Sequence, residues 1–206
     1  DTDVPVISSV AEGSATGDDF DYQNIIDSLT ISWSGSDGGS GITSYEYALG
    51  TTSGGMDVVD WASAGTATYD TLTGLSLAEG SSYFLSVRAT DIAGNISDVL
   101  SGDGITIDVT APTGTTVNDG TSDDITYTGS DTTLSANWAA FTDAASGVSK
   151  YEVSIGTTIE GTSILDWTDN GIETTYTKTG LTLSSGTIYF VNVRAADLVG
   201  NISDPI

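Results

Sequence analysis

Apolar side chains occur at every second position of two segments, 83–89 and 189–195, which read YFLSVRA and YFVNVRA. An alternation with period two is typical of a β-strand that buries one face. A Gly-Asn pair follows each segment, at 94–95 and 200–201, and glycine accepts the positive φ that a tight turn demands. Each segment is therefore predicted to be a strand that ends in a turn, after which the chain reverses.

Six further stretches in the first half of the chain carry strand signals, and turn-rich sequence separates them. They are 5–10, 28–35, 42–50, 58–62, 67–72 and 104–108. No stretch has the periodicity of an amphipathic helix. Seven short strands with turns between them indicate an antiparallel β-sandwich of about 100 residues.

The second half of the chain repeats the first. Of the 54 residue pairs between 45–98 and 151–204, 27 are identical. A repeat of this length denotes whole domains rather than solenoid units. Because 108–112 echo the start of the chain, we place the two domains at 1–108 and 109–206. The predicted fold class is all-β, with two tandem seven-stranded antiparallel sandwiches.

The second domain reaches Ile206 before any counterpart of the closing strand 104–108. We therefore expect it to lack its last strand within this chain. A sandwich without that strand exposes unpaired backbone groups and part of its core, which makes a site for strand addition. Residues beyond Ile206 in a longer native chain would complete the domain, or else a strand donated by a neighbouring subunit in a filament.

Charge and composition narrow the classes of function. The 206 residues include 29 acidic and four basic side chains, a formal net charge of −25 that would repel nucleic acid and anionic membrane surfaces. No apolar run approaches the roughly 18 residues that span a bilayer, and no signal peptide opens the chain, so we expect a mature or excised piece. Histidine and cysteine are absent and lysine occurs in only one of the two copies, so catalysis is not expected.

Several motifs resemble those of fibronectin type III repeats. They are Trp33 on the second strand, Tyr45 on the third, and the runs TGLSLAEGSSY and YFLSVRATDIAGNIS. The Asp-x-x-Ser-Gly loop, the Asp-Trp pair and the Ala-Gly-Asn turn resemble versions found in large bacterial surface proteins and adhesins, and in spacer regions of secreted polysaccharide-degrading enzymes. The resemblance covers both domains and implies a sandwich fold, but no particular activity.

The function expected from the sequence is that of a non-enzymatic, secreted or cell-surface module, structural and adhesive, which spaces or displays part of a stalk or filament. Its partners would be neighbouring repeats of the same protein or other copies of it. The alternative is a carbohydrate-binding or accessory spacer module of a secreted polysaccharide-degrading enzyme, with surface glycans as partners. In that alternative Trp61 and Trp167 would offer platforms to sugar rings, although we favour a role for both as covers of the sandwich core.

Arginine is rare in this chain, yet Arg88 and Arg194 occupy the same position of the repeat. Their neighbours on the strand point into the core, so both arginines point outwards. In this topology the sixth strand lies beside the third, where Glu46 and Glu152 also point outwards. We predict the cross-strand pairs Glu46–Arg88 and Glu152–Arg194, each contributing about 0.2–1 kcal/mol.

Aspartates recur at positions that the sandwich topology brings to one pole of each domain. Calcium would suit them, because it takes six to eight oxygen ligands at about 2.3–2.6 Å. The set in domain 1 is Asp1, Asp37, Asp91 and Asp98. The set in domain 2 is Asp108, Asp143, Asp197 and Asp204, which would face Asp18 and Asp19 of domain 1 across the linker. The alternative is that these aspartates only form Asx-turns or brace the Gly-Asn turns, without a metal.

Overall fold

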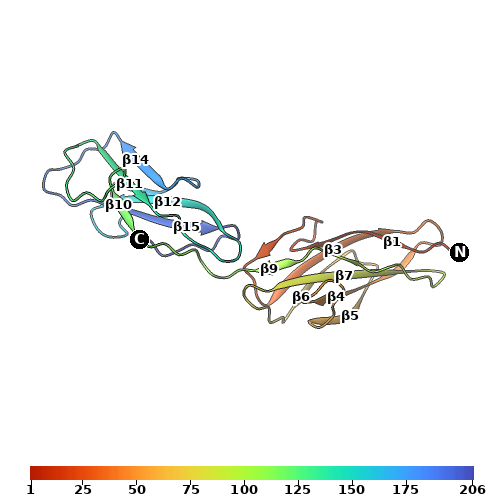
Figure 1. Ribbon diagram of the computed structural model, residues 1–206. Helices are drawn as coiled ribbons and strands as arrows, with labels where there is room; N and C mark the ends of the chain where they lie inside the picture. The colour runs from red at the N-terminus through yellow and green to blue at the C-terminus, as the bar shows by residue number, and fades with distance from the viewer. The chain divides into compact units, whose positions relative to one another are not determined.

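The computed structural model describes all 206 residues and consists of strands and turns. The chain divides into two compact units, Asp1–Val109 (unit 1) and Thr110–Ile206 (unit 2), and each has its own hydrophobic core. Figure 1 shows the strands of each unit packed as two layers. A membrane-spanning helix is absent from this structure. The all-β sandwich class predicted from the sequence is confirmed.

Unit 1 is built from two sheets. The first has the order β1-β3-β6, and its strands are β1 (Val6–Glu12), β3 (Ser28–Ser36) and β6 (Tyr69–Thr73). The second has the order β2-β9-β7-β4-β5, and its strands are β2 (Tyr22–Gln23), β9 (Ile105–Ile107), β7 (Ser82–Asp91), β4 (Ile42–Gly50) and β5 (Val59–Gly65). A short strand, β8 (Leu100–Ser101), also pairs with β7. All pairings are antiparallel except that of β2 with β9.

The core of unit 1 follows directly from the alternation in the sequence. Every second side chain of β3, β4 and β7 is buried, and Leu85, Val87 and Ile31 are almost fully excluded from solvent. Burial of each such aliphatic side chain stabilises the fold by about 1.5–3 kcal/mol. Trp33 packs at the centre of this core, with its ring centroid 6.1 Å from that of Tyr45 and 5.7 Å from that of Tyr47.

Unit 2 repeats this arrangement with six strands. One sheet has the order β10-β11-β14, and its strands are β10 (Val117–Asp119), β11 (Thr133–Trp138) and β14 (Thr175–Thr179). The other has the order β13-β12-β15, and its strands are β13 (Leu165–Asp169), β12 (Val148–Gly156) and β15 (Phe190–Asp197). Trp138 takes the place of Trp33 and contacts the ring of Tyr151 edge-on, with centroids 5.6 Å apart. β15 therefore lies at the edge of its sheet.

Two local features fix the start and the end of the long strand in each unit. The hydroxyls of Tyr83 and Tyr189 accept hydrogen bonds from the backbone N–H groups of Ala78 and Ser184, at 2.9 and 2.8 Å. This is the tyrosine corner of sandwich folds, which ties the strand to the preceding turn. The turn at the other end contains Gly94, whose φ of 91° is left-handed, as the sequence predicts.

Three details differ from the expected strands. β1 runs to Glu12 instead of ending at residue 10, because a bulge between Ile7 and Ser9 shifts its register and lets pairing continue. The two-residue strands β2 and β8 were not predicted, since so short a run carries no periodic signal. Unit 1 thus has two more short strands than the seven expected.

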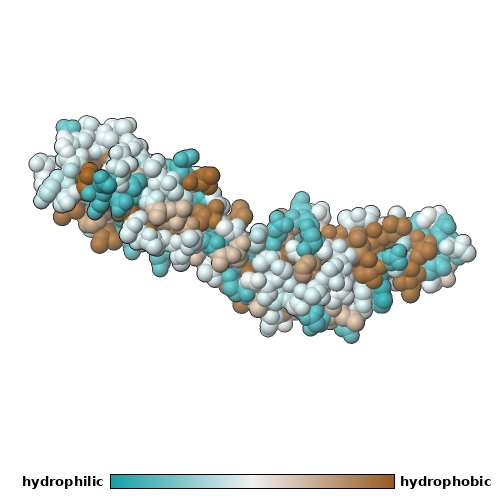
Figure 2. Space-filling view, in the orientation of Figure 1, coloured by the Kyte–Doolittle hydropathy of each residue, from teal (hydrophilic) through white to brown (hydrophobic).

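The surface is polar for the most part. Figure 2 shows hydrophilic and neutral colours over most of the visible face, with apolar residues in smaller groups. The charged side chains are predominantly acidic, since only four of the 33 are basic.

Candidate functional site

The outer face of the second sheet in unit 1 carries a stack of three side chains. Arg88 on β7 lies opposite Glu46 on β4, and its Nε is 2.8 Å from Glu46 Oε2. The guanidinium carbon of Arg88 also lies 4.3 Å from the ring centroid of Trp61, which β5 contributes. The predicted Glu46–Arg88 pair is therefore confirmed, and the tryptophan is an additional partner of the arginine.

Unit 2 contains the same stack. Arg194 Nη2 is 2.7 Å from Glu152 Oε2, and the guanidinium carbon lies 4.3 Å from the ring centroid of Trp167. Lys150 adds a second cation, with its Nζ 2.9 Å from Glu152 Oε1 and 3.3 Å from Asp169 Oδ2. The hydrogen bond from Lys150, followed by that from Arg194, lowers the pKa of Glu152, although partial burial opposes the shift. The Glu152–Arg194 prediction is confirmed as well.

These contacts correct the expected role of the two tryptophans. Trp61 and Trp167 do not cover the sandwich core, because each ring lies against an arginine that points away from the core. One face of each ring is occupied by a guanidinium group, so neither ring is a fully open platform for a sugar. The motif is a structural one, in which a charge pair and an aromatic ring link three neighbouring strands.

One pole of unit 1 brings together three of the four predicted aspartates. Carboxylate oxygens of Asp1, Asp37 and Asp91 lie within 4.8 Å of one another, whereas Asp98 is not part of the group. Asp91 is buried, and Asp37 is half-buried. Three of the four aspartates therefore meet at this pole, and their role as metal ligands stays a prediction.

Hydrogen bonds engage Asp91 and one oxygen of Asp37 at this pole, whereas Asp37 Oδ1 is buried without a hydrogen-bond partner. Asp37 Oδ2 accepts from the N–H of Gly41 at 2.7 Å, and Asp91 accepts from the backbone and side-chain nitrogens of Asn95, both at 2.7 Å. Burial alone would raise the pKa of Asp91, but these bonds from Asn95 and one from Gly94 hold it below its ordinary value. The alternative of an Asx-turn and a braced Gly-Asn turn describes this geometry, and calcium at the pole stays a prediction.

Unit 2 repeats the braced turns. Asp143 Oδ1 accepts from Gly147 at 2.8 Å, and Asp197 accepts from the backbone and side-chain nitrogens of Asn201 at 2.8 and 2.7 Å. Carboxylate oxygens of Asp143 and Asp197 lie within 4.8 Å of each other, and Asp204 does not join them. Asp108, Asp18 and Asp19 belong to unit 1, so the predicted interdomain site also stays a prediction.

A second acidic group lies in unit 1, and sequence reasoning missed it. Carboxylate oxygens of Glu12, Asp19 and Asp103 lie within 4.8 Å of one another, and Glu12 is fully buried. Burial, and to a smaller extent the charges of Asp19 and Asp103, raise the pKa of Glu12 to about 7. The only signal in the sequence was the position of Glu12 directly after the apolar pair at 10–11. Because the bulge in β1 interrupts the alternation, the sequence does not predict whether the Glu12 side chain points inwards or outwards.

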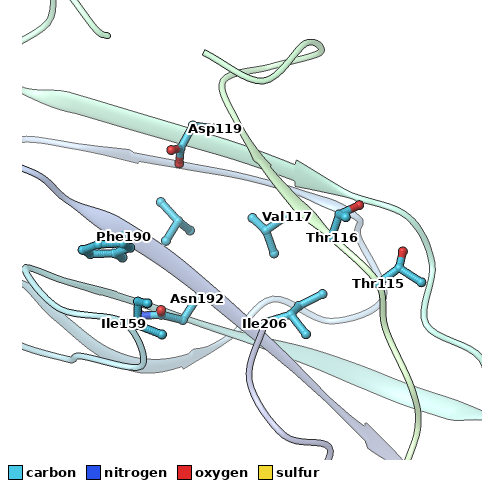
Figure 3. Close-up of a pocket in the computed structure, with 9 residues that line it drawn as sticks. Thr115, Thr116, Val117, Asp119, Ile159, Phe190, Asn192 and Ile206 are labelled. Atoms are coloured by element: carbon cyan, nitrogen blue, oxygen red, sulfur yellow. The ribbon is translucent and has the colours of Figure 1, made fainter. Parts of the chain in front are cut away.

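Unit 2 has a groove beside β15, with a volume of about 350 Å³. Figure 3 shows Val117 from β10 across from Phe190 on β15, with Ile206 at one end. Ile206 exchanges two backbone hydrogen bonds with Val193, at 2.9 and 3.0 Å. In unit 1 the segment from β8 to β9 occupies the corresponding edge of β7. Leu100 of β8 pairs with Val87 as Ile206 pairs with Val193, and Ile105 of β9 is completely buried. The groove has the geometry of the expected strand-addition site, and its occupant stays a prediction.

Comparison with known proteins gives relatives that share both units. No family model matches the chain. The chain is 34% identical over 183 residues, 85% of its length, to Exoglucanase B of Cellulomonas fimi, and 31% identical over 181 residues to Chitinase A1 of Niallia circulans. It spans only 14% and 22% of the lengths of these two relatives.

Solved structures of similar fold include domains A168–A170 of titin, with a TM-score of 0.53 and 19% identity. That match covers 98% of this chain and 64% of the titin chain. The fibronectin(III)-like modules of CbhA from Clostridium thermocellum align with a TM-score of 0.47 and 16% identity, over 98% of this chain and 90% of that chain. Together with the strand order, the likeness to titin establishes the fold and nothing further.

Proposed function

We propose that this chain, a tandem pair of fibronectin type III-like sandwiches, is a spacer segment of a secreted enzyme that degrades polysaccharides. Modules of this fold are non-catalytic, in line with the absence of histidine and cysteine. The observation that supports the proposal is the 34% identity over 183 residues to an exoglucanase, joined by 31% identity over 181 residues to a chitinase. Both alignments extend across most of the two units.

These relatives favour the enzyme spacer, which was the alternative from the sequence, over the adhesive stalk. An exoglucanase and a chitinase act on different polysaccharides, and the chain matches a small part of each. A segment shared by enzymes with different substrates is better suited to spacing or supporting other domains than to choosing a substrate. Secretion follows from the same proposal, since insoluble polysaccharides are degraded outside the cell.

The outer-face stacks favour a spacer over a carbohydrate-binding module. Sugar binding commonly uses exposed aromatic rings, but the rings of Trp61 and Trp167 each stack on an arginine at 4.3 Å. That arginine is held in turn by a glutamate on the neighbouring strand. The two tryptophans that the sequence offered as platforms for sugar rings are therefore engaged in packing.

A pull-down assay tests the spacer role. The purified chain is mixed with insoluble cellulose and with chitin, and the protein left in the supernatant is measured against bovine serum albumin as a non-binding control. We expect the chain to remain in the supernatant. Specific retention that is lost in Trp61→Ala or Trp167→Ala would overturn the spacer role and make the chain a carbohydrate-binding module.

A further inference from the structure

Glu12 lies at the end of β1, where it fills a gap in the strand pairing of unit 1. β7 pairs with β9 at Tyr83 and with β8 at Ser86, so the N–H of Leu85 between them has no strand partner. Glu12 Oε1 accepts this N–H at 2.9 Å. Glu12 Oε1 thus has a structural role as the acceptor for Leu85, which leaves the role of Glu12 Oε2 to be explained.

The second oxygen, Glu12 Oε2, is buried without any hydrogen-bond partner. It lies against the backbone of Gly102, directly before Asp103, since a Cβ on Gly102 would collide with it. On the other side, the backbone N–H of Glu12 donates to Asp19 Oδ1 at 2.9 Å, which holds that carboxylate beside Glu12. The unpartnered oxygen therefore belongs to the group formed with Asp19 and Asp103.

No cation of unit 1 can neutralise this group. The only basic side chain between residues 1 and 109 is Arg88, and its guanidinium is committed to Glu46 and Trp61 on the outer face of the sheet. Three carboxylates at this spacing repel one another, and a buried oxygen without a partner destabilises the fold. A proton or a cation taken up from solvent must therefore offset the charge of this group.

We propose that Glu12, Asp19 and Asp103 bind a calcium ion in unit 1. Two oxygens that each lie about 2.4 Å from one ion are at most about 4.8 Å apart, which is the limit within which the three carboxylates lie. The exposed Asp19 and Asp103 give the ion access from solvent, while the buried Glu12 supplies an oxygen that solvent does not reach. Backbone carbonyls and water would complete a shell of six to eight oxygens.

Unit 2 repeats part of this arrangement. Asp119 occupies the position of Glu12, since it pairs with Ala136 as Glu12 pairs with Ile31, and its N–H donates to Asp124 Oδ1 at 3.1 Å. The described residues of unit 2 bring no third carboxylate to this pair. Unit 1 is thus the unit in which the proposed site has all three acids.

Calcium titration of the whole chain, after removal of metals with a chelator, tests the proposal by isothermal calorimetry and by thermal unfolding. The variants are Asp103→Asn and Glu12→Gln, and the matched control is Asp18→Asn, which removes the same charge beside the site. We expect the wild type and Asp18→Asn to bind calcium and to melt at a higher temperature with it. Asp103→Asn and Glu12→Gln should lose at least about tenfold in affinity.

Asp103 is exposed, so Asp103→Asn decides the question even if Glu12→Gln fails to fold. Unchanged calcium affinity in Asp103→Asn would overturn the proposal, as would an identical melting curve of the wild type in calcium and in chelator. A further variant, Asp37→Asn, separates the pole at Asp1, Asp37 and Asp91 from this site. Calcium binding abolished by Asp37→Asn and retained in Asp103→Asn would place the ion at the pole instead.

Discussion

Arg88 and Arg194 each have two partners, a glutamate on the neighbouring strand and a tryptophan ring. The glutamates could be predicted, because strict alternation fixes which side chains of adjacent strands point outwards. The contact of Trp61 with Arg88 could not be predicted, because the pairing of β4 with β5 contains bulges on both sides of Tyr47. A bulge changes the face of the sheet on which the next side chain lies, and its position could not be predicted from the sequence.

A double-mutant cycle measures the coupling energy between Arg88 and Trp61 in unit 1. Arg88→Gln and Trp61→Leu are made singly and together, and the free energy of unfolding is measured with denaturant. We expect a coupling energy of about 0.5–1 kcal/mol, the range of a partly exposed cation–π contact. Arg88→Gln combined with Tyr69→Leu on the opposite sheet should be additive, and equal coupling in both cycles would contradict the assignment.

Tyr47 leads to a prediction about alkaline pH. Its hydroxyl donates to Asp70 Oδ2 at 2.7 Å, and burial, followed by that hydrogen bond, raises its pKa to about 12. Unfolded tyrosine ionises near pH 10. The neutral phenol therefore stabilises unit 1 fully below pH 10, and this contribution is lost as the pH rises towards 12.

The measurement for Tyr47 is the free energy of unfolding of wild type and Tyr47→Phe between pH 9 and 12. The difference between the two proteins should shrink as the pH rises through this window. Unit 2 has Val153 at the corresponding position of β12 and provides an internal reference. A constant difference would show that Tyr47 titrates normally in the folded protein.

Most strands and turns of the sandwich could be predicted from the sequence. The strand 42–50 coincides with β4, and the Gly94 turn falls where the pattern puts it. The short strands β2 and β8 could not be predicted, because only backbone hydrogen bonds define them. Glu12 escaped notice for a related reason, since its partner is the N–H of Leu85, a backbone group that no sequence pattern marks.

The open edge of β15 predicts binding of a strand like β9. A synthetic peptide with the sequence of residues 101–110 should add to this edge, because its two alternating isoleucines match the apolar groove at Val117 and Phe190. Hydrogen–deuterium exchange of the whole chain is the measurement. We expect the peptide to slow amide exchange in residues 188–192, the counterparts of the β7 residues that pair with β8 and β9. Exchange in β7 should stay unchanged, and Val193 is already paired with Ile206.

The control for strand addition is the same peptide with both isoleucines replaced by aspartate, Ile105→Asp and Ile107→Asp. It keeps the backbone donors and acceptors but cannot enter an apolar groove. Equal protection by both peptides, or by neither, would show that the edge of β15 does not accept a strand of this type.

At the scale of the whole molecule, charge and repetition are the dominant properties. A net charge of −25 over 206 residues makes self-repulsion the main electrostatic effect, since only three of the four basic side chains form ion pairs. The repeat was visible in the sequence because 27 of 54 pairs are identical, and it predicted two domains of one fold. The biological role was not visible, because a sandwich presents the same pattern in an enzyme spacer and in a stalk.

Salt should therefore stabilise the chain. Raising sodium chloride shortens the screening length from about 10 Å at 0.1 M to about 3 Å at 1 M, and repulsion among 29 acidic groups weakens more than a few surface ion pairs do. Thermal unfolding in the presence of chelator, which removes any effect of calcium, should show a midpoint that rises with salt. A midpoint that falls would mean that the ion pairs outweigh the repulsion.

The proposal that the chain belongs to a secreted polysaccharide-degrading enzyme is tested most directly with an antibody raised against the 206 residues. The antibody is used to deplete the culture medium of the source organism, and hydrolysis of cellulose and chitin is assayed in the depleted medium and in the precipitate. Our account predicts that the antigen is in the medium and that hydrolytic activity on one of these polysaccharides follows it into the precipitate. Antigen that stays on the cells and precipitates without hydrolytic activity would contradict the account and favour an adhesive stalk.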